Sequence, residues 1–142
     1  MDHNIKTGIR TLWEKAQTAY VGSVDEEGFP QIKAMFVPKQ GNIKIQYFST
    51  NTSSKRAAQF LKNPKASVYY CDEDNVKGAL FTGTMEVCTD HETKALIWSD
   101  GDEQYYPNGV DDEDYCVFKF TAETVKYWPD SQKRRFPIDD LL

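Results

Sequence analysis

Hydroxyl and cationic side chains are concentrated between Ser49 and Arg56, in the segment "STNTSSKR". Lys55 and Arg56 stand where a helix is predicted to begin, although the positive end of a helix dipole favours acidic residues there. The free N–H groups of a first helical turn, hydroxyls beside them and a cation within reach together form an anion site. The alternative is that Ser53 or Ser54 only caps the helix while both cations point into solvent, which is common.

Charge is unevenly distributed along the chain, whose net charge is −5. Residues 28–71 contain seven Lys and Arg and no acidic residue, whereas residues 72–142 contain 17 Asp and Glu and seven Lys and Arg. A nucleic-acid-binding domain is normally basic throughout, with cations and aromatics interleaved. The acidic remainder therefore argues against a nucleic-acid partner and favours a local anionic ligand.

A second candidate is Lys33, in the segment "GFPQIKAM" at residues 28–35. A hairpin turn there leads into a strand that carries Lys33 between apolar neighbours. If this strand lies beside residues 43–50, Lys33 projects toward the same anion as Lys55. The period-two alternation of a half-exposed strand explains a surface lysine equally well.

Other kinds of site have less support. The chain has no Gly-x-Ser-x-Gly elbow and no histidine placed to serve one, so nucleophilic catalysis is not expected. It has only two histidines, His3 and His91, and no Cys-x-x-Cys pair, so a zinc site is not expected. The acidic residues of 100–114 lack the spacing and terminal glutamate of an EF-hand, so they are interpreted as a solvated loop. Four aromatic residues could stack on a flat ligand, but core or dimer interface is the commoner role: Trp98, Tyr105, Tyr106 and Trp128.

The elements that position these residues are mostly strands. Runs of branched and aromatic residues separated by turn residues predict six strands, at 18–24, 29–39, 43–50, 66–72, 78–89 and 115–128. Helical spacing predicts helices over 3–16 and 53–62, and a capping box at 89–92 opens a third that reaches Trp98. The sum is a mainly β fold, a small antiparallel barrel with three short helices and a loosely ordered polar tail over 128–142.

Length and composition are consistent with this plan. At 142 residues the chain is predicted to form a single domain over 1–142. It contains no run of eighteen apolar residues and no basic-then-apolar leader, so we expect a cytosolic protein. Three widely spaced cysteines, Cys71, Cys88 and Cys116, are expected to be reduced and strand-borne.

The order of these motifs resembles the pyridoxamine 5′-phosphate oxidase-like family of FMN-binding split β-barrels, and within it the general stress protein 26 branch. The resemblance runs from about Ile5 to Trp128. It is carried by "GFPQIKAM", "YFSTNTSSKRAAQFLKNPKASVYY", "LFTGTMEV" and "LIWSDGDEQYYPNGVDDEDYCVFKF". It implies a six-stranded antiparallel Greek-key split barrel and a homodimer that holds two FMN molecules at its interface.

The resemblance also implies roles for particular residues. Lys33 stands near the flavin phosphate and ribityl chain, where the family usually has arginine, with Ala34 and Met35 lining the flavin. Ser49 and Thr50 end the next strand against the flavin. The phosphate clamp matches Ser54, Lys55 and Arg56, and Trp98 is placed to reach the flavin of the other subunit.

Two departures from the family pattern bear on function. Lysine at position 33 lacks the forked geometry with which arginine grips phosphate. The tail "WPDSQKRRFPIDDLL" does not reproduce the Arg- and His-containing segment with which true pyridoxamine phosphate oxidases hold their substrate, so vitamin B6 oxidation is not expected. The leading hypothesis is an FMN-dependent oxidoreductase acting on an unknown small molecule in stress response. Its alternatives are a non-catalytic flavin-binding stress or sensor protein, and a protein that binds haem or a deazaflavin.

Overall fold

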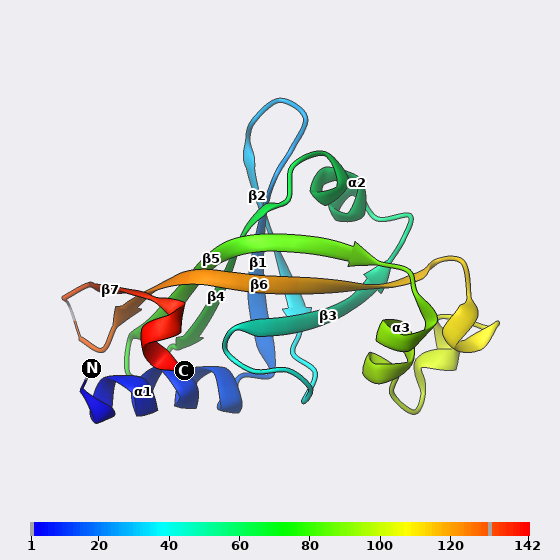
Figure 1. The fold of residues 1–142 in the computed structure, drawn as a ribbon. Helices are drawn as coiled ribbons and strands as arrows, with labels where there is room; N and C mark the ends of the chain where they lie inside the picture. The colour runs from blue at the N-terminus through cyan, green and yellow to red at the C-terminus, as the bar shows by residue number, and fades with distance from the viewer. Residues whose placement is uncertain (1, 131) are drawn as a thin grey trace.

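A computed structural model of the protein describes residues 2–130 and 132–142. All six predicted strands and all three predicted helices are present, and a seventh strand and three short 3-10 helices join them (Figure 1). The helices are α1 (His3–Lys15), α2 (Lys55–Lys62) and α3 (His91–Ile97). The strands are β1 (Thr18–Val24), β2 (Pro30–Phe36), β3 (Ile45–Asn51), β4 (Lys65–Asp72), β5 (Lys77–Cys88), β6 (Tyr115–Trp128) and β7 (Arg134–Pro137). The 3-10 helices are η1 (Asp102–Gln104), η2 (Gly109–Asp111) and η3 (Ile138–Leu141).

The strands form one antiparallel sheet in the order β2-β1-β4-β5-β6-β3, with β7 added to the outer part of β6. The terminal strands of this order, β2 and β3, approach each other without pairing. The sheet therefore curls into a barrel that remains split between β2 and β3, which confirms the predicted fold. β5 and β6 bend around a register shift at Thr82 and Gly83, where a Cβ on Gly83 would lie 2.0 Å from the Thr121 carbonyl oxygen.

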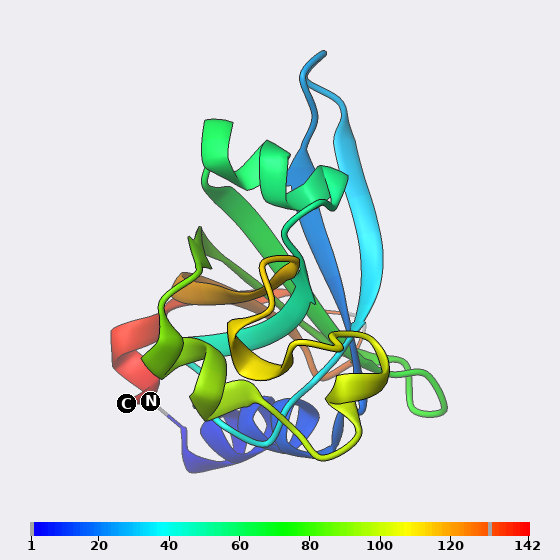
Figure 2. The ribbon, with the colours of Figure 1, turned by 90° about the vertical axis from the view of Figure 1, so that its right-hand side faces the viewer.

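The core fills the barrel between α1 and α2, which cover its two ends (Figures 1 and 2). Tyr70 and Phe81 pack edge to face inside it, with ring centroids 5.7 Å apart. At the α2 end, Phe60 packs edge-on against Phe118 at 5.2 Å. Both arrangements are ones that aromatic rings prefer, and they fix α2 to the barrel.

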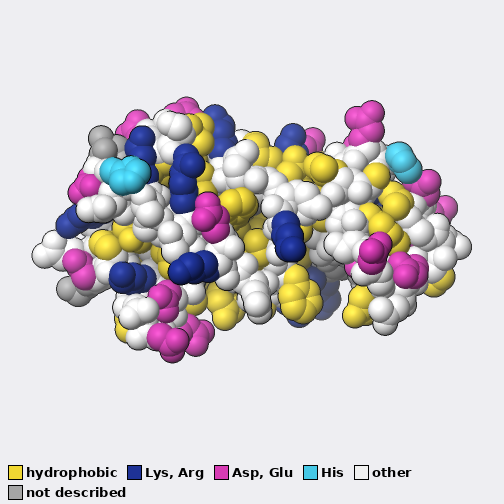
Figure 3. Space-filling model, turned by 90° about the horizontal axis from the view of Figure 1, so that it is seen from below, with side chains coloured by type: hydrophobic (Ala, Val, Ile, Leu, Met, Phe, Trp, Pro, Cys, Tyr) yellow, Lys and Arg dark blue, Asp and Glu magenta, His cyan; other side chains and the backbone are white. Residues whose placement is uncertain are grey.

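A second, smaller cluster lies around α3 and the adjoining parts of β3, β5 and β6. Its buried members are Cys88, Ile97, Tyr106, Tyr115 and Val117, and Tyr47 and Trp98 pack against them. This cluster supports the loop over residues 99–114, which contains η1 and η2. Seen from below, the end of the molecule formed by α3 and this loop shows mainly acidic side chains among its charges, and Lys and Arg gather nearer α1 (Figure 3).

Two predicted helix starts require correction. α2 begins at Lys55 with Ser54 as its cap, because the Ser54 side chain accepts the Ala57 N–H. The cap of α3 is Asp90 and not Thr89, because the Asp90 carboxylate accepts the N–H and the hydroxyl of Thr93. In each case the residue nearer the helix forms the capping hydrogen bond.

The prediction of a loosely ordered tail is wrong for the described part of residues 128–142; Ser131 lies outside the described residues. β7 pairs with β6, and η3 buries Ile138 and Leu141 against the core. The Arg10 guanidinium donates to the Leu141 carbonyl oxygen at 2.9 Å. These two apolar residues anchor the tail because both are buried in the main core cluster.

The cysteines lie on strands as predicted: Cys71 on β4, Cys88 on β5 and Cys116 on β6, all with free thiols. Burial raises the pKa of Cys88 to about 12, with Glu86 adding to the effect, so this thiol is protonated at neutral pH. Within the described residues, each helix is too short or too polar to form a membrane span.

Candidate functional site

The split between β2 and β3 brings together the residue groups that the sequence predicted separately. Lys33, Ala34 and Met35 lie on β2, and Ser49 and Thr50 lie near the end of β3. These two strands are the edges of the curled sheet and approach each other. The two groups therefore flank the place where the barrel is open.

β2 is much more exposed than its pairing with β1 predicts. All of its residues except Met35 are exposed, although the strand is hydrogen-bonded along its whole length. Gln31 and Lys33 lie four and two residues before buried Met35, so all three share the side of β2 that continues the core. A strip on the inner side of β2 thus has no cover from the chain itself.

Ser49 and Thr50, by contrast, do not act as a pair. Alternation along β3 buries Gln46, Phe48 and Thr50 on the core side and leaves Ser49 exposed on the other. Thr50 is therefore on the face of β3 that continues the core, as Lys33 is on β2, whereas Ser49 turns away from it.

The start of α2 lies directly beyond β3. The Ser54 hydroxyl accepts the Ala57 N–H at 3.2 Å, so the simple capping interpretation is correct for this serine. The N–H groups of Lys55 and Arg56, in the first turn, have no partner within the helix. Lys55 is exposed, and Nε of Arg56 is, among the described residues, the one buried side-chain nitrogen or oxygen without a hydrogen-bond partner. Uncommitted donors therefore gather at this helix end.

Sequence reasoning missed the residues that hold the turn before α2, residues 51–54. The backbone carbonyl of Asp114 accepts the Thr52 N–H at 2.7 Å, and its carboxylate accepts the Ser53 N–H at 2.9 Å. The Tyr106 hydroxyl donates to the Asn51 side chain. No local signal marks these contacts, because they depend on the pairing of Asn51 with Tyr115 across β3 and β6.

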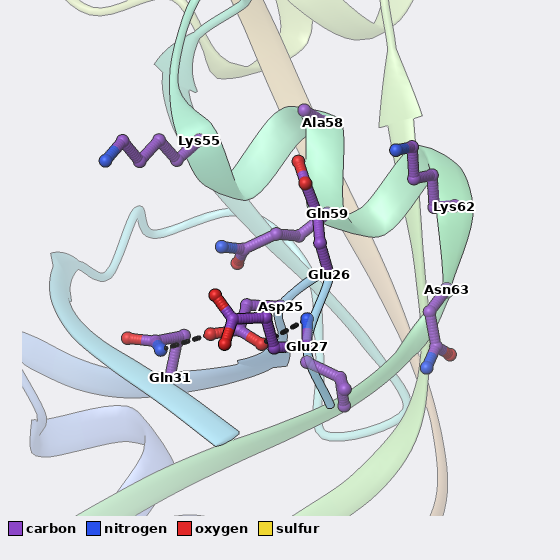
Figure 4. A pocket seen from close by; sticks show the side chains of 10 residues that line it. Asp25, Glu26, Glu27, Gln31, Lys55, Ala58, Gln59, Lys62 and Asn63 are labelled. Atoms are coloured by element: carbon purple, nitrogen blue, oxygen red, sulfur yellow. Dashed lines mark hydrogen bonds between the residues drawn. The ribbon is translucent and has the colours of Figure 1, made fainter. Parts of the chain in front are cut away.

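A cleft of about 430 Å³ lies between the β1–β2 hairpin and α2 (Figure 4). Asp25, Glu26 and Glu27 lie on the hairpin side, and Lys55 and Lys62 on the α2 side. Of the predicted site residues only Lys55 lines it. Acidic side chains form one wall of the cleft and would repel a phosphate. The first turn of α2 is therefore better suited to a phosphate than the cleft is.

The hairpin itself is held by Asp25. Its carboxylate accepts the Phe29 N–H at 2.8 Å, the Glu27 N–H at 2.9 Å and the Gln31 amide at 2.8 Å. These hydrogen bonds lower the pKa of Asp25 below its usual value, and the one from the Phe29 N–H has the largest effect. The hairpin tip is therefore negatively charged at neutral pH and faces Lys55 and Lys62 across the cleft.

Trp98 does not lie with the other predicted residues within one chain. It follows α3 and packs on Tyr115 and Tyr106, with ring centroids 5.2 and 6.3 Å away. Of the other aromatics, Tyr106 is buried in its own chain and Tyr105 is exposed. Trp128 packs against Tyr69. Contact between Trp98 and a second subunit stays a prediction.

The acidic loop shows no arrangement suited to a cation. In the described part of the chain, no group of three or more His, Cys, Asp or Glu is placed to hold a metal ion. The Asp112 carboxylate is instead turned inward, where it accepts the N–H groups of Asn108 and Asp114 at 3.1 and 3.0 Å. The loop is thus organised by its own backbone.

Comparison with known proteins gives one family and several related structures. The profile of the pyridoxamine 5′-phosphate oxidase family matches residues 5–129. A protein from Clostridium acetobutylicum is 35% identical to this chain. It is related to general stress protein 26 of Bacillus subtilis and belongs to the pyridoxine phosphate oxidase family. Its structure superimposes with a TM-score of 0.90 over 100% of both chains. No functionally curated protein matches the sequence.

Two more distant structures share the fold. General stress protein 26 from Bacillus anthracis is 18% identical, with a TM-score of 0.76 over 94% of this chain and 99% of that one. A heme binding protein from Mycobacterium smegmatis is 14% identical, with a TM-score of 0.79 over 99% of this chain and 61% of that one. At these identities the likeness concerns the fold alone.

Proposed function

Because the chain belongs to the pyridoxamine 5′-phosphate oxidase family, we propose that it is a homodimeric FMN-binding protein of the cytoplasm. In this proposal it is an oxidoreductase that acts on an unidentified small molecule in stress response. The observation that carries the cofactor assignment is the group of uncommitted donors at the start of α2.

The phosphate of FMN would bind at the first turn of α2. The N–H groups of Lys55 and Arg56, the Lys55 ammonium and the partnerless Nε of Arg56 are all donors, and two of these groups are cationic. A buried donor without a partner costs free energy, which an anionic ligand here would recover. Ser54 contributes by fixing the turn, because its hydroxyl already caps Ala57.

The flavin ring would lie along the split. Lys33 and Met35 belong to the inner side of β2, and Thr50 to the inner side of β3. Ala34 would contribute through its backbone, and Ser49 only from the strand's opposite face. In this assignment Met35 supplies apolar contact to the ring, and Lys33 and Thr50 supply the polar groups that orient it.

The dimer would form over β2. Phe29, Ile32 and Phe36 are 61%, 75% and 87% exposed, which is unusual for three large apolar residues so close together. A second subunit would cover them and the open strip. In this arrangement Trp98 would approach the flavin of the other subunit.

The chemistry would come from the cofactor. FMN, when bound, can accept or donate a hydride, and the protein supplies binding, orientation and exclusion of water. Vitamin B6 oxidation is not part of the proposal, since the tail lacks the family's substrate-binding segment. FMN is preferred to haem because His3 and His91, the chain's histidines, lie at the exposed starts of α1 and α3, away from the split.

The test is a titration of the purified protein with FMN, followed by flavin absorbance and by quenching of flavin fluorescence. We expect binding at micromolar concentration or tighter, with one FMN per subunit. Mass spectrometry of small molecules released from the denatured protein would identify a copurifying flavin. No binding at micromolar FMN would refute the cofactor assignment. Failure of NADH, NADPH and candidate substrates to reduce or reoxidise a loaded dimer would instead favour the sensor alternative.

A further inference from the structure

We infer that Asp114 is a positioning residue that sets the anion affinity of the α2 start. It holds the preceding turn in place and at the same time puts a competing negative charge beside it. This inference rests on the proposed FMN site and concerns a residue outside the group assigned to the cofactor. It explains why an acidic loop is fastened to the most basic part of the chain.

The acidic loop is in direct contact with the turn before α2. Asp114 accepts two successive N–H groups, that of Thr52 through its backbone carbonyl at 2.7 Å and that of Ser53 through its carboxylate at 2.9 Å. The next residue along the turn is Ser54, the α2 cap. The Asp114 carboxylate thus lies just ahead of the helix end that would receive the phosphate.

The backbone of Asp114 is held by further hydrogen bonds. Its own N–H donates to the Asp112 carboxylate at 3.0 Å, and Asp112 is buried. The Asp112 carbonyl oxygen accepts from the buried ammonium of Lys94 on α3 at 3.2 Å. A chain of hydrogen bonds therefore runs from α3 through the loop to the turn. It holds the Asp114 backbone in place, and the Ser53 N–H holds the carboxylate beside the helix end.

The Asp114 carboxylate also has an electrostatic effect on the helix end. A carboxylate near the positive end of a helix dipole stabilises the helix. The same charge repels a phosphate that binds there, and the effective dielectric constant near a protein surface leaves this repulsion appreciable. Asp114 should therefore favour the folded protein without ligand and weaken the binding of anions. A residue with a structural role only would not have these two opposite effects.

The test compares Asp114→Asn with the wild-type protein. Asparagine keeps a side-chain oxygen that can accept the Ser53 N–H and removes only the charge. We expect FMN to bind about three- to tenfold more tightly, and the ligand-free protein to melt at a lower temperature. Glu113→Gln is the matched control, since it removes the same charge from the neighbouring exposed residue, and it should change the dissociation constant less than twofold. Asp114→Ala also removes the hydrogen-bond acceptor. This variant should have a lower melting temperature than Asp114→Asn and should bind FMN less tightly than Asp114→Asn.

Equal or weaker FMN binding by Asp114→Asn would overturn the inference. If the wild-type protein binds no FMN, the proposed function fails, and a titration with inorganic phosphate followed by the amide resonances of Lys55 and Arg56 decides the inference separately. Tighter phosphate binding by Asp114→Asn supports it. Unchanged, weaker or absent phosphate binding by that variant contradicts it.

Discussion

Lys55→Glu tests the proposed phosphate site by reversing the charge of an exposed residue whose side chain makes no ion pair among the described residues. A hydrogen bond to a charged group contributes about 1.5–3 kcal/mol. Repulsion between the new carboxylate and the phosphate adds about 1 kcal/mol in a watery environment. Because Lys55 is exposed, we take the lower part of the combined range, about 2.5–3 kcal/mol, which corresponds to a dissociation constant about 60- to 150-fold larger.

The same substitution should have the opposite effect on folding. A glutamate in the first turn of α2 interacts favourably with the helix dipole, by about 0.3–1 kcal/mol. The melting temperature of Lys55→Glu without ligand should therefore be equal to or above that of the wild type. Loss of binding in this variant cannot then be attributed to loss of structure.

Lys62→Glu is the matched control, because it makes the same charge reversal in the last turn of the same helix. A carboxylate there opposes the dipole, so this variant should be slightly less stable. Its dissociation constant for FMN, measured by fluorescence quenching at about 0.15 M salt where long-range effects are screened, should change less than about threefold. Equal weakening by both variants, or none by Lys55→Glu, would refute the assignment of the phosphate to the α2 start.

Three further predictions concern the tail, the dimer and the response to alkali. Leu141→Ala should lower the free energy of unfolding by about 2–5 kcal/mol in a denaturant titration because Leu141 is fully buried, whereas Leu142→Ala, at a 58% exposed residue, should leave it nearly unchanged. Phe36→Asp should convert the dimer to a monomer in sedimentation experiments. The control Val76→Asp changes a similarly exposed residue of another hairpin and should leave the dimer intact. A monomeric wild-type protein would contradict the proposed interface. Burial raises the pKa of Tyr106 from 10.0 to about 12, so the folded state favours the protonated phenol. The free energy of unfolding should therefore be retained below pH 10 and fall between pH 10 and 12. Circular dichroism against pH measures this, and a Tyr106→Phe variant with an identical alkaline transition would show that another group is responsible.

Much of the fold could be predicted from local sequence. Alternation and turn residues place β1 at 18–24 and β6 at 115–128 with the bounds that the structure has. These signals are reliable because a strand that buries one face and a hairpin turn each impose their residue types over a few positions. The tail escaped prediction because two isolated apolar residues, Ile138 and Leu141, show no periodicity, and their burial depends on packing against core residues that are distant in the chain.

The candidate site divides in the same way. Ser54 as a cap, and Lys55 and Arg56 at a helix start, follow from residues that are neighbours in the chain, so the sequence alone was enough to place them. Other features of the site depend on how the sheet curls and where α2 packs. Lys33 and Thr50 flank one opening, and Ser49 faces away from it. Arg56 keeps a buried donor without a partner. The contact of Asp114 with Ser53 depends further on the register between β3 and β6. Sequence determines local conformation and charge, whereas tertiary structure decides which of those charges meet, because strand pairing brings together residues that are dozens of positions apart.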